Sequence, residues 1–271
     1  MKIGAILPHL GQFGGVRRFL EIGNIMVDRG HDFVIFSNKQ KHCDWFEFKG
    51  RFASWDRIHA DRILIGDPPS FRVLARAKGK TYIYVIAGGK FLDGYKSAYG
   101  RYPFILNNRV FKKWFPKSKL AEGGVNTNHF RAPILPRPHL GTRVIYYERG
   151  GKGADFIKHS LKGIKGLAVA GVRGLNNNQL LKKYYSADFY VAWESRPGWC
   201  NMAAEALACN LTVVGNGVNC EPFADGIIKV KNLRQFFKNR SNWNKRKRYP
   251  MDEFSWEHVC NKLMKIVGGN N

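Results

Sequence analysis

A single carboxylate, Glu205, lies early in an Ala-rich segment that directly follows a loop containing Pro and Gly. The segment, residues 200–209 (CNMAAEALAC), consists largely of strong helix formers and predicts a helix. A strand that enters a helix through a tight glycine loop aims unpaired backbone N–H groups at one point, where the helix dipole also favours an anion. The pattern therefore predicts a phosphate site at the start of this helix. Glu205 lies one turn further in, within reach of ribose hydroxyls, so a nucleoside diphosphate is the first ligand to consider.

A second group of candidate residues surrounds the first predicted strand, KIGAILP, and the glycine-rich loop HLGQFGGVRR that follows it. Gly14 and Gly15 precede a helix and are expected to line a ligand, although their spacing is not the G-x-G-x-x-G of dinucleotide sites. His9 is either a catalytic group or an ordinary hydrogen-bonded loop histidine. Asp67 ends the predicted strand ADRILIGD at the carboxyl edge, where α/β ligands gather, and its alternative role is a helix cap.

Buried strands alternate with helices in both halves of the chain, which predicts parallel, doubly wound sheets. Between the halves, the Pro-rich segment 131–141 (RAPILPRPHLG) has no regular period and predicts a linker. An apolar stripe predicts a final helix over about residues 255–266. We therefore expect one domain over 1–135, a second over 142–253, and a C-terminal helix over 254–271 that could cross back to the first domain.

The chain is cationic along its whole length: 45 Lys and Arg against 20 Asp and Glu give its 271 residues a formal net charge of +25. The excess is about +13 before Leu135 and about +12 after it, so no basic tail accounts for it. Such a field attracts polyanions, and nucleic acid and an anionic membrane surface are the two candidates. The alternative is a basic protein without a polyanionic partner.

The cations expected to contact a polyanion or acceptor are Arg17, Arg18, Lys49 and Arg51. The last two alternate with aromatic residues that either stack on nucleotides or form a buried apolar patch: Trp45, Phe46, Phe48, Phe52 and Trp55. The dense run Lys245–Arg248 is either a further polyanion contact or a solvated face.

Other features of the sequence favour a cytoplasmic protein. No run of 18 apolar residues predicts a transmembrane helix, and the N-terminus lacks the pattern of a signal peptide. The five cysteines are odd in number and scattered, which is typical of free thiols in a reducing compartment.

Several segments, in order and over nearly the full chain, resemble glycosyltransferase family 4. GQFGGVRR and GHDFVIFS resemble the family's opening glycine loop and second strand, and FILNNRVFKKWFPKSKLAEGGVNTNHF resembles the segment that closes its first domain. RVIYYERGGKGADFI resembles the opening of the donor domain, SADFYVAWESRPGWCNMAAEALACNLTVV its E-x7-E loop and helix, and FSWEHV its closing helix. The resemblance implies an α/β protein of the GT-B fold: two Rossmann-like, doubly wound domains that face each other across a cleft. The N-terminal domain would bind the acceptor and the C-terminal domain the nucleotide sugar.

The resemblance also implies a retaining transfer from a nucleotide sugar, with no essential metal or other cofactor. Glu205 would hydrogen-bond the ribose, and Arg149 and Lys152 would neutralise the diphosphate leaving group, where negative charge develops. The further donor contacts that it implies are Gly14 and Gly15 at the phosphates or sugar, the backbone around Gly198, Cys200, Asn201 and Met202 at the sugar or phosphate, and Val172 and Arg173 near the base.

Two positions depart from the family's pattern. The first glutamate of E-x7-E falls on Pro197, so Glu194, three residues earlier, is the candidate for its sugar-contacting role. A histidine that is common after the strand TYIYVIAGG is replaced by Ala-Gly-Gly at residues 87–89. His9 is the candidate that holds the transferring sugar in its place.

Three functions stay open on the sequence alone. The first is transfer from a nucleotide sugar, by family frequency UDP-linked, to a hydroxymethylated DNA base flipped out of the duplex, as compact phage enzymes do. The second is a peripheral-membrane glycosyltransferase that acts on a lipid or envelope glycan. The third is a DNA-binding module without turnover. The expected location is the cytoplasm, that of the host if the protein is viral, and no obligate protein partner is inferred.

Overall fold

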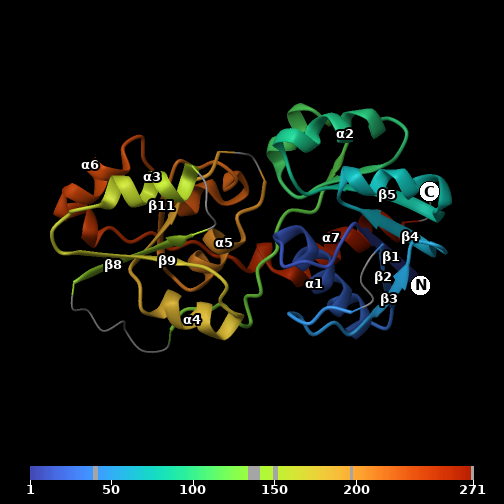
Figure 1. Ribbon diagram of the computed structural model, residues 1–271, viewed down its shortest axis with the longest axis horizontal. Helices are drawn as coiled ribbons and strands as arrows, with labels where there is room; N and C mark the ends of the chain where they lie inside the picture. Colours follow the sequence, from blue (N-terminus) through green and yellow to red (C-terminus); the bar gives the residue numbers. More distant parts are fainter. Residues whose placement is uncertain (39–41, 134–140, 149–151, 196–197, 270–271) are drawn as a thin grey trace. The chain divides into compact units, whose positions relative to one another are not determined.

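The computed structural model describes residues 1–38, 42–133, 141–148, 152–195 and 198–269 (Figure 1). The chain divides into two compact units: unit 1 is Met1–Gly124 with Trp256–Asn271, and unit 2 is Val125–Ser255. The described strands form two sheets of seven and five strands, and their pairings are parallel. The prediction of two parallel, doubly wound sheets is therefore confirmed.

The sheet of unit 1 has the order β3-β2-β1-β4-β5-β6-β7. Its strands are β1 (Lys2–Leu7), β2 (Asp32–Ser37), β3 (Arg51–Ser54), β4 (His59–Ile65), β5 (Lys78–Val85), β6 (Phe104–Leu106) and β7 (Lys119–Leu120). Its α-helices are α1 (Gly14–Asp28), α2 (Leu92–Ala98) and α7 (Trp256–Val267), and its 3-10 helices are η1 (Pro68–Arg76), η2 (Gly89–Phe91) and η3 (Arg109–Lys113). The run of strands is apolar because both faces of the sheet are covered, as parallel sheets require.

Different helices cover the two faces of this sheet. On one face, Phe19 of α1 and Leu263 of α7 pack in one core with Ile35 and Tyr84. On the other face lies a separate core to which η1, α2 and η3 contribute. Helix α7 thus belongs to unit 1 although it follows unit 2 in sequence, and its predicted span is correct to within one residue.

The sheet of unit 2 has the order β12-β11-β10-β8-β9. Its strands are β8 (Thr142–Tyr147), β9 (Leu167–Val172), β10 (Phe189–Ala192), β11 (Thr212–Gly215) and β12 (Ile227–Lys229). Its α-helices are α3 (Lys152–Leu161), α4 (Asn177–Tyr185), α5 (Asn201–Ala208) and α6 (Leu233–Lys238), with 3-10 helices η4 (Glu221–Gly226), η5 (Arg240–Asn244) and η6 (Asp252–Phe254).

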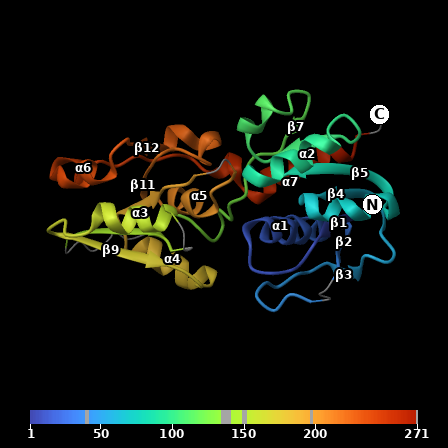
Figure 2. The same ribbon diagram turned by 45° about the horizontal axis from the view of Figure 1, so that its top comes forward.

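Unit 2 is also layered on both faces of its sheet. Residues of α3 and α6 share one core with alternate residues of β8, β10 and β11, whereas α4 and α5 share the opposite core with the intervening residues of the same strands. Figure 2 shows α3 and α4 on opposite sides of this sheet. Helix α4 begins with a capping box: the Asn176 side chain accepts from the Gln179 backbone N–H, and the Gln179 side chain accepts from the Asn176 backbone N–H.

Each sheet reverses its direction of winding at one point. In unit 1 the chain builds β2 and β3 on one side of β1 and then places β4 on the other side; in unit 2 it places β9 on one side of β8 and then β10 on the other. At such a switch point the connections leave the sheet in opposite directions and leave a crevice at the carboxyl ends of the strands, where α/β proteins bind ligands. The predicted phosphate site with Glu205 follows β10. The second group of candidates follows β1 (His9, Gly14 and Gly15) and β4 (Asp67).

Candidate functional site

The segment from β10 through α5 to β11 has the predicted strand–loop–helix–strand form. Strands β10 and β11 pair from Phe189 with Thr212 to Ala192 with Gly215. Helix α5 begins at Asn201, its N-cap residue Cys200 provides no side-chain cap, and its first turn contains no acidic residue. The partial positive charge of the helix start is therefore not offset by a local carboxylate, which is the arrangement that favours an anion.

The loop between β10 and α5 is held at both ends by the loop after β11. Asn216 donates from Nδ2 to the Glu194 carbonyl oxygen at 2.6 Å and accepts at Oδ1 from the Glu194 N–H at 3.4 Å. The Cys200 N–H donates to the Asn219 carbonyl oxygen at 3.1 Å. Gly198 is buried, whereas Asn201 and Met202 are half-buried. The predicted backbone contacts at Gly198 and Cys200–Met202 thus lie at the start of one helix, beside an anchored loop.

Glu205 is buried in unit 2, with an exposed fraction of 2%. Its Oε2 accepts a hydrogen bond from the Tyr184 hydroxyl of α4 at 3.1 Å. Burial and the nearby Glu205 carboxylate raise the pKa of Tyr184 well above its ordinary value, so the phenol stays protonated and able to donate. A ribose would reach this carboxylate only if neighbouring side chains move aside, a requirement that the helical position alone did not indicate.

Glu194 and Glu205 lie around the same buried side chain, Tyr190 of β10. Burial raises the pKa of Tyr190 well above its ordinary value, and the charges of Cys200, Glu194, Cys220 and Glu205 raise it further. The charges of two predicted site carboxylates thus act on one side chain of β10. Tyr184, Tyr190 and Asn216 organise this part of unit 2, and the sequence singled out none of the three.

The elements after β8 and β10 approach each other closely. A Cβ on Gly153, in the first turn of α3, would lie 2.5 Å from the Trp193 carbonyl oxygen, so glycine is needed at this position. Phe156 of α3 stacks on Trp193 with ring centroids 4.5 Å apart. The starts of α3 and α5 therefore flank the switch point of this sheet. Lys152 is the first residue of α3, whereas Arg149 and the side chain of Lys152 lie outside what the structure describes.

Val172 and Arg173, the predicted neighbours of a nucleotide base, stand at the carboxyl end of the edge strand β9. Val172 is buried and Arg173 is exposed. The Val172 carbonyl oxygen accepts from the Glu148 N–H at 3.0 Å, which holds the segment after β8 against the end of β9. Lys158 forms an ion pair with Glu148. These residues lie on the β9 side of the same switch point.

In unit 1, Gly14 and Gly15 begin α1, immediately after the loop that leaves β1. Gly14 is exposed. A Cβ on Gly15 would lie 2.8 Å from Cδ1 of Ile86, which follows β5, so the first turn of α1 packs tightly against that loop. Phe13, at the N-cap, is 52% exposed, the highest fraction among the exposed large apolar side chains of the described chain.

His9 lies beside Phe13, with ring centroids 5.1 Å apart. Its Nδ1 accepts from the Gly11 N–H at 3.2 Å, so in the neutral ring the proton is carried by Nε2. His9 therefore is a hydrogen-bonded loop histidine, and it is also a half-buried donor at the carboxyl end of β1.

Asp67 follows β4 at the same edge of the sheet. It occupies the N-cap position of η1, but its side chain makes no cap hydrogen bond, so the helix-cap interpretation is wrong. Burial raises the pKa of its carboxyl, and the positive charges of His9 and Lys90 oppose that rise. The switch point of unit 1 thus brings His9 and Asp67 together with Lys90, a residue that the sequence did not single out.

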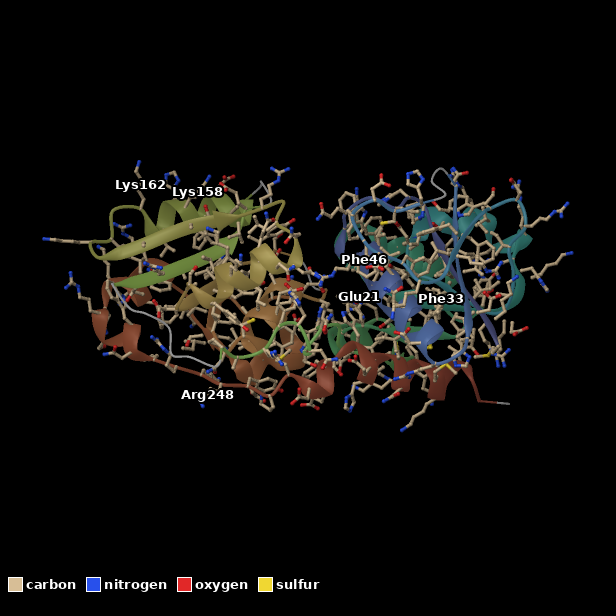
Figure 3. The ribbon with its side chains drawn as sticks, turned by 90° about the horizontal axis from the view of Figure 1, so that it is seen from below. Glu21, Phe33, Phe46, Lys158, Lys162 and Arg248 are labelled. Carbon is tan, nitrogen blue, oxygen red and sulfur yellow. The ribbon has the colours of Figure 1, made fainter. Side chains whose placement is uncertain are left out.

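Two of the predicted polyanion contacts are committed to unit 1 itself. Arg18 is 2% exposed; its guanidinium donates to the Tyr84 hydroxyl at 2.9 Å and to the Gly123 carbonyl oxygen at 2.7 Å, and it lies over the Trp256 ring. The prediction that Arg18 contacts a polyanion is therefore wrong, because its cation is buried and used in the core. Arg17 is half-buried and pairs with Glu21 of the same helix; Figure 3 labels Glu21.

Lys49 and Arg51 are exposed and form ion pairs with Asp28 and Asp32 respectively. Among the aromatic side chains around them, none is exposed: Trp55 is buried, and the other four pack at the edge of the unit 1 cores. The buried-patch interpretation of this cluster is therefore the correct one.

The Lys245–Arg248 run is partly tied down as well. Arg246 pairs with Asp188 at 3.4 Å, Lys247 donates to the Ile227 carbonyl oxygen at 3.3 Å, and Lys245 lies over the Phe236 ring. Exposed cations nevertheless remain on unit 2, and Figure 3 labels Lys158 of α3, Lys162 directly after α3, and Arg248.

Neither a metal cluster nor a membrane span is found in the described parts of the chain. No three or more His, Cys, Asp or Glu side chains among these residues are grouped so that they could hold a metal ion. No described helix is both long and apolar enough to cross a membrane.

No family model and no curated protein sequence matches the chain. Solved structures do. The chain is similar to sucrose-phosphate synthase from Thermosynechococcus elongatus, with a TM-score of 0.76 and 12% identity over 98% of each chain. It is also similar to a lipopolysaccharide outer core galactosyltransferase, with a TM-score of 0.67 and 10% identity over 99% of each chain. A third similar structure, at a TM-score of 0.62 and 11% identity over 99% of each chain, is an alpha-glucosyltransferase in complex with UDP and a 13-mer DNA.

These similarities extend over the full length of the chain and establish its architecture. The protein has the GT-B fold of glycosyltransferases, as the sequence predicted. At identities near 11% the similarity carries the fold alone, and the activity has to be argued from the residues at the two switch points.

Proposed function

We propose that the protein is a glycosyltransferase that moves a sugar from a nucleoside diphosphate to a hydroxyl acceptor. The observation that carries this proposal is the start of α5, an uncapped helix terminus beside the anchored loop after β10, at the switch point of the unit 2 sheet. Unpaired N–H groups placed there would bind the diphosphate. The GT-B fold of the whole chain agrees with this use of the site.

We assign the donor to unit 2, Val125–Ser255, and the acceptor to unit 1, Met1–Gly124 with Trp256–Asn271. In unit 2 the diphosphate would lie between the starts of α3 and α5, the ribose at Glu205, and the base beside Val172 and Arg173. Glu194, which approaches Tyr190 from the loop, would contact the transferring sugar, and Arg149 with Lys152 would supply cations to the leaving group.

Transfer requires stabilisation of the charge that develops on the departing diphosphate. The attraction between fixed N–H dipoles or cations and the diphosphate grows as the sugar–oxygen bond breaks. These groups therefore stabilise the transition state more than the ground state and lower the barrier. We propose departure and attack on the same face of the sugar, with the leaving phosphate oxygen taking the proton of the acceptor hydroxyl, and hence retention of configuration. An inverted product would contradict this mechanism. This scheme assigns no step to a metal ion.

For the acceptor we favour a hydroxymethylated base in DNA, with a UDP-linked sugar as donor. The formal charge of +25, spread over both units, provides the long-range attraction that a phosphate backbone needs. A protein of the same fold was solved with UDP and DNA. A lipid or envelope glycan is the second candidate, favoured by the similarity to the lipopolysaccharide galactosyltransferase.

The test of the proposed function has two arms. The first measures release of free nucleoside diphosphate from a panel of nucleotide sugars, and the proposal predicts release from at least one of them. Absence of release from every donor would contradict it and favour a binding module. The second arm measures binding to duplex DNA and to vesicles that contain anionic lipid, each over a range of salt concentrations. DNA binding with a steep salt dependence supports the DNA acceptor, whereas vesicle binding alone supports the membrane alternative.

A further inference from the structure

Besides buried hydroxyls such as that of Ser37, the carboxyl edge of the unit 1 sheet holds two buried oxygen atoms that can only accept hydrogen bonds and that lack donors among the described residues. They are Oδ1 of Asp67, after β4, and Oδ1 of Asn107, after β6. Strands β4, β5 and β6 are consecutive neighbours in the sheet, so the two residues flank the end of β5. Buried acceptors are normally satisfied in folded proteins, and an unsatisfied pair at the edge where α/β folds bind ligands calls for a donor from outside the chain.

The local structure holds both oxygens in place. The Asn107 side chain donates from Nδ2 to the Ile86 carbonyl oxygen at 3.1 Å and its residue is 1% exposed, so its amide orientation is fixed by the end of β5. The Asp67 carbonyl oxygen accepts from the Ser70 N–H at 2.9 Å, which fixes the backbone while the side chain makes no cap. Tyr95 donates to the Gly66 carbonyl oxygen at 2.6 Å, which holds the backbone directly before Asp67.

Charge and shape around Asp67 specify the kind of ligand. Burial raises the pKa of the Asp67 carboxyl, and the positive charges of His9 and Lys90 oppose that rise; in its ionised form the carboxylate is a hydrogen-bond acceptor only. The exposed ring of Phe13 stands next to His9 at the same edge and offers an apolar surface to a ring. A ligand that suits this edge donates hydrogen bonds from hydroxyl groups and presents a ring face.

We propose that Asp67 and Asn107 form the acceptor subsite of unit 1, in which the Asp67 carboxylate accepts a hydrogen bond from a hydroxyl of a ring-bearing acceptor. This inference rests on the proposed function, because it names the residues of unit 1 that select and orient the hydroxyl to be glycosylated. Asp67 orients this hydroxyl and does not take its proton, which goes to the leaving phosphate. The donor is bound elsewhere, so its reaction with water does not need this carboxylate.

The test compares transfer with donor hydrolysis in Asp67→Asn, a variant that keeps size but loses the charged acceptor. The probes are duplex DNA that contains 5-hydroxymethylcytosine, and glycerol at high concentration as a small polyol. We expect Asp67→Asn to lower kcat/KM for transfer by about tenfold or more, the effect of losing one charge-assisted hydrogen bond, while donor hydrolysis stays within about twofold. The matched control is Asp93→Asn, which removes a carboxylate of unit 1 that is 91% exposed, and should change neither rate.

The possible results distinguish an acceptor subsite at Asp67 from a role of this residue in donor binding or in the fold. If hydrolysis and transfer fall together in Asp67→Asn, the residue serves the donor or the fold, and the inference is wrong. The inference is also wrong if transfer by Asp67→Asn is unchanged. It is wrong too if the wild type hydrolyses a donor but glycosylates neither probe. A wild type that releases no nucleoside diphosphate at all overturns the proposed function, and the inference with it. Asn107→Ala provides the second variant, with the same expected split and the melting temperature as a check that it folds.

Discussion

Replacing Glu205 tests whether its carboxylate serves a nucleotide or only the fold. The residue is 2% exposed and accepts a hydrogen bond from Tyr184, so a structural role competes directly with ribose binding. If the ribose donates one hydrogen bond to this carboxylate, its loss removes about 1.5–3 kcal/mol of binding free energy. At 1.4 kcal/mol per tenfold change, the dissociation constant for the nucleotide should rise by roughly 10- to 150-fold.

Isothermal titration calorimetry with the nucleoside diphosphate that gives the largest thermal stabilisation is the appropriate assay, since it needs no acceptor. Glu205→Gln keeps the side-chain volume and avoids a cavity, so its effect reports on the charged acceptor. Tyr184→Phe is the matched control: it removes the donor to Glu205 and should lower the free energy of unfolding by about 1.5–3 kcal/mol, with little change in nucleotide affinity. A Glu205→Gln protein that melts normally and binds the nucleotide as tightly as the wild type would refute the ribose contact.

Three further predictions follow from the described contacts. Arg18→Met should lower the free energy of unfolding by roughly 2–4 kcal/mol, measured by denaturant titration, because the Gly123 carbonyl oxygen and the Tyr84 hydroxyl lose a buried charged partner; a change below about 0.5 kcal/mol would show that this guanidinium is dispensable. Cys43 is half-buried, whereas Cys200, Cys209, Cys220 and Cys260 are buried, and burial raises the pKa of Cys260 to about 12, so a thiol reagent applied to native protein at pH 8 should modify Cys43 first. Fast modification of Cys260, read by peptide mass spectrometry, would contradict its burial next to α1. If DNA is bound, Lys162→Gln combined with Arg248→Gln should reduce the slope of log affinity against log salt by at most about 2, whereas Arg18→Met should not change it, and an equal effect of both proteins would point to loss of fold rather than loss of phosphate contacts.

The elements of the fold could be predicted because their signals are local. Apolar runs of strand length marked β1, β2, β10 and β11, and the Asn cap of α4 and the apolar stripe of α7 fixed helices to within a residue or two. Segment η1 begins at Pro68, a residue type that favours the first turn of a helix, and is a 3-10 helix. The region around Trp45 gave no clear period, because its aromatic side chains close the edge of a core rather than line a regular element.

The roles of individual charged residues were harder to predict. Arg17 and Arg18 are adjacent in a basic loop-and-helix motif, and only the fold shows that one of them is buried between Tyr84 and Trp256. Asp67 could be a cap or a ligand group, and the choice depends on a hydrogen bond that sequence cannot report. The sequence did not single out Lys90 for the same reason: its charge acts on Asp67 because β4 and β5, which the two residues follow, are neighbours in the sheet.

The central claim is that unit 2 binds an activated sugar at the carboxyl ends of β8, β9 and β10. Photo-crosslinking with a UDP-sugar that carries an azide on the uracil ring, followed by peptide mass spectrometry, tests it most directly. The account predicts that the label falls on the peptide containing Val172 and Arg173 and disappears with excess unlabelled UDP. A label that excess UDP displaces from unit 1, with none in unit 2, would contradict it.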